Sequence, residues 1–136
     1  MENPANKHSK NIKILVLGLG NILLKDEGAG VHIIRKLGKL ALPDYVEIID
    51  GGTASLDVLL LAQNIRKLVV IDAVTKNGKP GSIYKFQLKD HQQNKGREVL
   101  NDDYRISLHQ IDFIGALAAI KKLGSMPEEI MIIGVE

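Results

Sequence analysis

The stretch that decides the fold is residues 12–28, IKILVLGLGNILLKDEG. Its first part, residues 12–18, is a nearly continuous apolar run that ends in glycine, which is typical of a strand buried on both faces of a parallel sheet. Apolar residues then recur at helical spacing and a proline ends the pattern: Val31, Ile34, Leu37, Ala41 and Pro43. We therefore predict a helix over residues 26–41, with Asp26 as its N-cap.

Four further strands and two further helices are expected along the chain. The strands are predicted over residues 45–49, 68–74, 82–88 and 129–135, and the helices over residues 55–65 and 107–123. The connection 75–81 is too short for a parallel crossover, so the fourth strand should run antiparallel at an edge of the sheet. We interpret residues 50–53 (DGGT) as a turn, residues 89–106 as a polar loop and Gly124 as the helix end. This order predicts an α/β sandwich with a mostly parallel sheet.

Composition excludes several classes of protein. The 136 residues fit one globular domain, with 45% hydrophobic and 25% charged residues. The absence of cysteine excludes disulfides, thiolate metal sites and a cysteine nucleophile, and it suits the cytoplasm. A net charge of +2 and 4% aromatic residues do not indicate a nucleic-acid partner. No apolar run is long enough for a membrane span, and residues 1–11 are expected to be a disordered polar tail.

Ligands of open α/β sheets bind beyond the carboxyl ends of the strands, which directs attention to the loop after the first strand. Gly18-Leu19-Gly20 begins like a dinucleotide fingerprint, but Leu23 stands where the third glycine is needed. Asp26 and Glu27 would also repel a phosphate at the start of the helix. A nucleotide site is therefore disfavoured. Both acids have a simpler interpretation as helix-capping residues, and Glu27 could equally ligate a metal at the mouth of the sheet.

Two further residues could carry chemistry at this edge. Asp72 interrupts the apolar run at the carboxyl end of the third strand, where a buried acid needs a partner. It could also serve as a loop cap or in an ion pair. His109 lies in the first turn of the helix predicted over 107–123. Together with Glu27 these side chains would form a carboxylate–carboxylate–imidazole set, which suits Ni, Zn, Fe or Mn. The sequence contains no Gly-x-Ser-x-Gly, His-Glu-x-x-His or P-loop motif.

Four blocks of the sequence resemble the [NiFe]-hydrogenase maturation endopeptidases. They are residues 14–31 (ILVLGLGNILLKDEGAGV), 42–53 (LPDYVEIIDGGT), 70–74 (VIDAV) and 107–110 (SLHQ). The resemblance implies a five-stranded twisted sheet between helices on both faces. It also implies a single domain over residues 12–136. Members continue past the last strand into a final helix, so this domain is expected to lack its C-terminal helix.

The resemblance also implies an activity and its residues. The activity is removal of the C-terminal extension of a [NiFe]-hydrogenase large-subunit precursor after nickel insertion, by an aspartic-type endopeptidase. The metal-binding and catalytic positions of the family fall on Glu27, Asp72 and His109, and the nickel they contact is carried by the precursor. The segment Asp50-Gly51-Gly52-Thr53 would lie at the same rim and help to hold the substrate. A nucleotide-binding module and a nickel-dependent protein that binds precursor without cutting it remain as alternatives.

Overall fold

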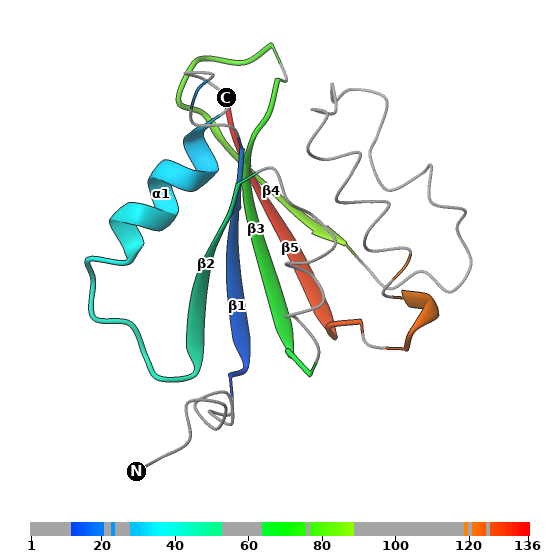
Figure 1. Ribbon diagram of the computed structural model, residues 1–136. Coiled ribbons are helices and arrows are strands. Elements are labelled where there is room, and N and C mark those ends of the chain that lie inside the picture. Colours follow the sequence, from blue (N-terminus) through cyan, green and yellow to red (C-terminus); the bar gives the residue numbers. More distant parts are fainter. Residues whose placement is uncertain are drawn as a thin grey trace.

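A computed structural model describes residues 12–20, 23, 28–52, 64–75, 77–88, 119, 121–124 and 126–136. Its elements are, in chain order, β1 (Ile14–Leu19), α1 (Ala29–Leu37), β2 (Val46–Gly52), β3 (Lys67–Ala73), β4 (Ile83–Leu88) and β5 (Glu129–Val135). The strands form one sheet in the order β2-β1-β3-β5-β4 (Figure 1). Strand β4 is antiparallel to β5 at the edge, and the other pairs are parallel. The predicted mostly parallel sheet with one antiparallel edge strand is confirmed.

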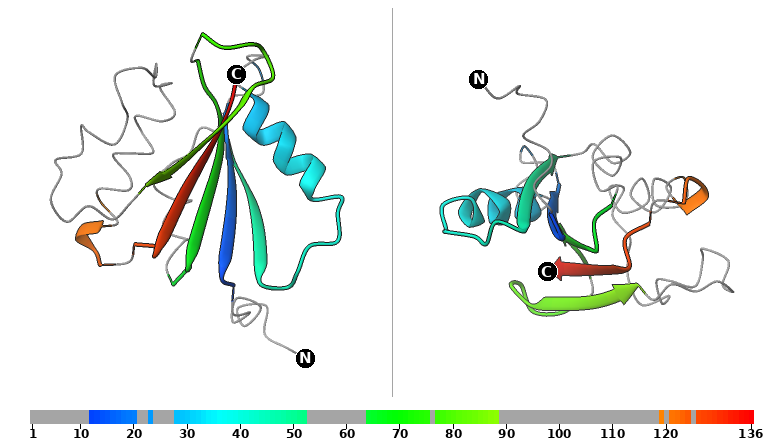
Figure 2. Two further views of the ribbon diagram at one scale, coloured as in Figure 1. Left: turned by 180° about the vertical axis from the view of Figure 1, so that it is seen from behind. Right: turned by 90° about the horizontal axis from the view of Figure 1, so that it is seen from below.

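The central strands are buried because their side chains are apolar on both faces. On one face an apolar cluster extends across β1, β3 and β5, formed by Leu15, Leu17, Leu19, Ile65, Leu68, Val70, Ile130 and Ile132. On the opposite face α1 packs against β1, β2 and β3 (Figure 2), and it buries Val31 and Ile34 there. Each such side chain contributes roughly 1.5–3 kcal/mol of burial free energy. The sheet is thus held by apolar packing on both sides of its centre.

Helix α1 is shorter than the sequence pattern indicates. It begins at Ala29, and its N-cap is Gly28, which has no side chain to bond to the first turn, so the prediction of Asp26 as the cap is wrong. It ends at Leu37, not at residue 41. After Leu37 the backbone forms a tighter turn, in which the N–H of Lys39 donates to the carbonyl of Lys36 and the N–H of Leu40 donates to the carbonyl of Leu37. Such i→i+3 bonds satisfy orphan carbonyls at a helix end before the chain extends toward a proline.

Two glycines let α1 approach the sheet closely. A Cβ atom on Gly18 of β1 would collide with the Ile34 side chain and the Gly30 carbonyl. A Cβ atom on Gly30 of α1 would collide with the carbonyl oxygens of Leu19 and Ile71. The helix backbone therefore rests directly on the carboxyl-terminal halves of β1 and β3. This contact fixes where α1 begins. It also means that close packing of the helix, and not a bound phosphate, accounts for the glycine at position 18.

Strand β2 is longer than predicted, because the sequence Asp50-Gly51-Gly52 continues the strand instead of forming a turn. The register of the β1–β2 pair shifts at this point, since Gly18 faces Asp50 but Leu19 faces Gly52. Gly51 is therefore an extra residue, as in a β-bulge. Gly52 has a φ of +49°, and its carbonyl accepts the N–H of Gly20 at 2.9 Å. The bulge keeps β2 paired to β1 up to the edge of the sheet.

Two predicted helices lie largely outside the described residues. Of the helix predicted over 55–65, the structure describes Asn64, whose φ of +65° places it in a turn, and Ile65, which precedes β3. That helix therefore does not reach residue 65. At the end of the segment 107–123, the N–H of Leu123 donates to the carbonyl of Ala119, and Gly124 follows with a φ of +73°. A glycine with positive φ is the usual helix terminator, as predicted.

No helix among the described residues is long and apolar enough to cross a membrane. The segments 1–11 and 89–106, expected to be a tail and a loop, fall outside the part of the chain that the structure describes.

Candidate active site

The carboxyl ends of β1, β2, β3 and β5 meet at one edge of the sheet, the upper edge in Figure 1. The strand order reverses direction at β1, because β2 lies on one side of it and β3 on the other. Crevices for ligands form at such switch points in open α/β sheets. The loop after β1 and the end of β3 therefore border the expected ligand position.

Asp72 is the one buried polar or charged residue among those that the structure describes, with 1% of its surface exposed. It shares a face of β3 with Leu68 and Val70, because side chains alternate along a strand. Its Oδ1 atom accepts the backbone N–H of Ala73 at 2.8 Å. Within the described part of the chain, no buried side-chain nitrogen or oxygen lacks a hydrogen-bond partner. Asp72 is thus a buried and hydrogen-bonded carboxylate at the switch point.

The surroundings of Asp72 follow from the sheet register. Two apolar rows cross the sheet below it, Leu15–Leu68–Ile130 and Leu17–Val70–Ile132. In the next row Asp72 pairs with Gly134 of β5, and the β1–β3 pairing ends one residue earlier, at Gly18 and Ile71. The carboxylate therefore sits where the apolar core ends at the carboxyl edge. Burial there is costly for a charge, and such acids cluster at functional sites.

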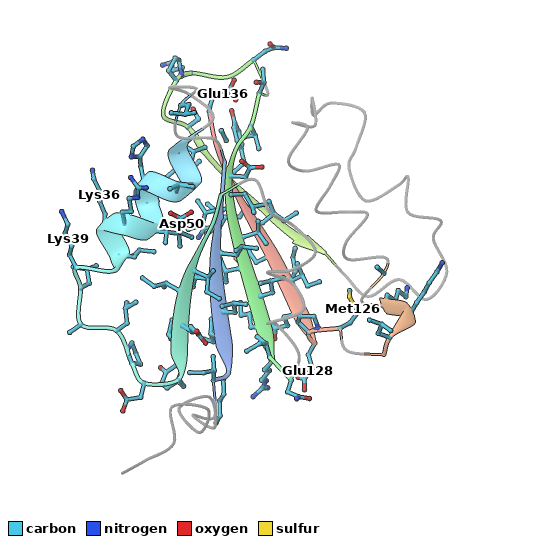
Figure 3. The ribbon with its side chains drawn as sticks, in the orientation of Figure 1. Lys36, Lys39, Asp50, Met126, Glu128 and Glu136 are labelled. Carbon is cyan, nitrogen blue, oxygen red and sulfur yellow. The ribbon has the colours of Figure 1, made fainter. Side chains whose placement is uncertain are left out.

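The segment Asp50-Gly51-Gly52, part of the segment 50–53 predicted to hold substrate, reaches the same edge, and its one side chain, that of Asp50, lies on the α1 face of the sheet. Asp50 points toward α1 (Figure 3), where its Oδ2 lies 3.9 Å from Arg35 Nε. Its Oδ1 accepts the N–H of Gly52 at 3.0 Å. Asp72 lies on the opposite face of the sheet, so the structure does not bring these two carboxylates together. Gly51 is buried against Leu17, so this segment presents the partly buried backbone of Gly52 at the rim.

Glu27, His109 and Thr53 lie outside the described residues, so their predicted roles stay predictions. Within the described part of the chain, no three His, Cys, Asp or Glu side chains gather as a metal-binding group. Of the predicted carboxylate–carboxylate–imidazole set, the structure places Asp72. It lies at the sheet edge where the sequence predicted it.

Sequence reasoning missed two neighbours of Asp72. Gly134 pairs with it across β3 and β5, and a Cβ atom there would lie 2.7 Å from both Cγ atoms of Val74. Val74 is buried, and its N–H donates to the carbonyl of Val135 at 2.9 Å. A glycine inside an otherwise apolar strand, Ile130–Val135, was the available signal, because such a glycine marks a close approach.

Comparison with known proteins identifies the family. The family model described as hydrogenase maturation protease matches residues 31–136. The hydrogenase 2 maturation protease of Escherichia coli strain K12 is 40% identical over 126 residues, which make up 91% of this chain and 73% of that protein. The chain belongs to the hydrogenase maturation proteases. Membership in this family makes it an endopeptidase of hydrogenase maturation.

Solved structures of the family agree with the fold. The hydrogenase-maturating endopeptidase HybD from Escherichia coli superimposes with a TM-score of 0.75 at 37% identity, covering 91% of this chain and 74% of that one. The [NiFe]-hydrogenase maturation protease HybD from Thermococcus kodakarensis gives a TM-score of 0.69 at 27% identity, covering 91% of this chain and 79% of that one.

A second relative was compared by sequence. The hydrogenase expression/formation protein HupD of Bradyrhizobium diazoefficiens is 33% identical over 129 residues, which make up 94% of this chain and 64% of that protein. These comparisons favour neither the nucleotide-binding module nor the non-catalytic binder.

Proposed function

We propose that the chain removes the C-terminal extension of a [NiFe]-hydrogenase large-subunit precursor after nickel has been inserted. Family membership supports a hydrogenase precursor as the substrate. The choice of the large subunit, and of nickel as the signal that maturation is complete, extends this assignment. The cytoplasm is the compartment expected for such a reaction.

The observation that carries the proposal is the burial of Asp72 at the carboxyl end of β3, beside the switch point of the sheet. In the proposed site Glu27, Asp72 and His109 contact the nickel that the precursor brings. A nickel ion accepts carboxylate oxygen and imidazole nitrogen ligands. It would polarise a water molecule or the scissile carbonyl, so that the water adds to the peptide carbon, the C–N bond breaks and a proton of the water passes to the leaving amine. No serine or cysteine nucleophile is required for this step.

The rim segment Asp50-Gly51-Gly52-Thr53 is proposed to hold the substrate peptide. The backbone at Gly52 suits this role, because no side chain there keeps an approaching chain at a distance. Asp50 would act indirectly, since its carboxylate bonds to the N–H of Gly52 and braces the bulge. Substrate recognition at this rim would therefore depend on how closely the peptide can approach the backbone.

The proposal is tested by a cleavage assay on nickel-loaded precursor with Glu27→Gln, Asp72→Asn and His109→Ala. Asp72→Asn keeps the shape of the side chain but removes its charge, so we expect kcat to fall by about 100-fold or more. Asp44→Asn is the matched control, because it makes the same substitution at an exposed carboxylate just before β2, at the opposite edge of the sheet. Full activity in all three site variants would refute the assignment.

The same assay distinguishes the proposed enzyme from a protein that binds precursor without cutting it. A non-catalytic binder would retain nickel-loaded precursor in a pull-down without shortening it, whereas the proposed enzyme releases a shortened large subunit. Mass spectrometry of the product distinguishes the two results.

A further inference from the structure

The row that holds Asp72 has an unusual composition for a buried sheet. Its partner on β5 is Gly134, which has no side chain. Val74 follows Asp72 by two residues, directly after the end of β3. A Cβ atom on Gly134 would lie 2.7 Å from Cγ1 and Cγ2 of Val74 and 3.2 Å from its Cβ atom. Carbon atoms in ordinary contact stay about 3.5–4.0 Å apart. Val74 therefore occupies the space that a side chain at position 134 would need.

The backbone ties this contact to the carboxylate. Asp72 and Gly134 are register partners, and one step later the N–H of Val74 donates to the carbonyl of Val135. Between them, the N–H of Ala73 donates to Asp72 Oδ1. The segment 72–74 is thus held by β5 on one side and by its own carboxylate on the other. Any displacement of Val74 is passed to Asp72 through two peptide units.

From this geometry we infer that Gly134 is a positioning residue for Asp72. Because Gly134 lacks a side chain, the side chain of Val74 can pack over β5 and hold the end of β3 in place. An added methyl group would push Val74 away by about 1 Å and tilt the peptide unit that bonds to Asp72 Oδ1. Displacements of about 1 Å in a catalytic site can lower the rate by about 100-fold. The inference rests on the proposed function of Asp72 and deepens it.

The test compares Gly134→Ala with the double variant Gly134→Ala/Val74→Ala in the cleavage assay on nickel-loaded precursor. We expect the single variant to lower kcat by about 100-fold while KM changes little, because the binding rim is untouched. Removing the Val74 methyl groups relieves the two 2.7 Å overlaps and leaves the 3.2 Å approach of its Cβ atom, so the double variant should recover at least about tenfold of that loss. An unchanged kcat in the single variant, or no recovery in the double variant, would overturn the inference.

Two controls separate positioning from loss of stability. Ile130→Ala opens a cavity on the same face of β5, two rows from Asp72, and should lower the Tm while leaving kcat unchanged. If it lowers kcat as strongly as Gly134→Ala, the inference fails. Val74→Ile enlarges the other partner of the same contact and should also lower kcat, which keeps the test decisive if Gly134→Ala does not fold.

A second readout does not depend on cleavage. The carboxyl ¹³C resonance of Asp72, assigned by its loss in Asp72→Asn, should move in Gly134→Ala and return toward its original position in the double variant. If the resonance behaves so but the unmodified protein does not cleave precursor, the proposed function fails and the positioning role stands. If the unmodified protein cleaves and Gly134→Ala changes neither kcat nor the resonance, the positioning role fails and the proposed function stands.

Discussion

Two glycine-to-alanine substitutions on the same stretch of chain should change stability in opposite directions. Gly30 lies inside α1, and Gly38 directly follows its last residue with a φ of −61°. Helix propensity alone predicts that alanine stabilises both positions, by up to about 1 kcal/mol. The structure predicts this gain for Gly38 only, where a Cβ atom would meet Ile48 Cδ1 at 3.4 Å, close to an ordinary contact.

At Gly30 the added methyl group would overlap the carbonyl oxygens of Leu19 and Ile71. These oxygens belong to the sheet and cannot move aside, so α1 must shift outward by about 1 Å. Val31 and Ile34, which are 1% and 4% exposed, would then lose a quarter to a half of their packing against the sheet. With about 2–3 kcal/mol of burial for each side chain, and overpacking of about 1–3 kcal/mol, we expect a net loss of about 3 kcal/mol.

The assay is urea unfolding followed by circular dichroism, with both variants measured beside the unmodified protein. A loss of about 3 kcal/mol corresponds to a fall in Tm of roughly 12 °C for a chain of this size. Gly38→Ala should raise the free energy of unfolding by about 0.4–1 kcal/mol. A loss below about 1 kcal/mol for Gly30→Ala, or an equal loss for both variants, would refute the reasoning from close packing.

Two further predictions concern stability alone. Gly124 has a φ of +73° and open space around it, so Gly124→Ala should cost about 1 kcal/mol of unfolding free energy and Gly124→Asn less, which urea unfolding can measure. The Arg35–Asp50 pair is exposed, at 55% and 43% of its side chains, so Arg35→Ala should change stability by less than about 0.5 kcal/mol at any salt concentration. A larger or strongly salt-dependent change would contradict a weak surface contact.

The strands were predictable because each is a short apolar run bounded by turn formers. Strand β5 was found with its observed bounds, and the other strands differ by one to three residues at their ends. The largest difference is in β2, which continues through Asp50-Gly51-Gly52. A pair of glycines normally indicates a turn, and only pairing with β1 turns it into a bulge. The predicted start of α1 at residue 26 was wrong for a similar reason, because the contact of Gly30 with the sheet decides where α1 begins.

Sequence by itself determined the strand order along the chain, the antiparallel edge strand and the acid at the end of β3. These follow from local apolar runs, from the length of one connection and from a single carboxylate in an apolar segment. Tertiary structure decided that Asp72 and Asp50 lie on opposite faces, and that Gly18, Gly30 and Gly134 serve close packing. The physical reason is that a close contact belongs to two segments at once. Its partner lies on another element, so no local pattern of residues reveals it.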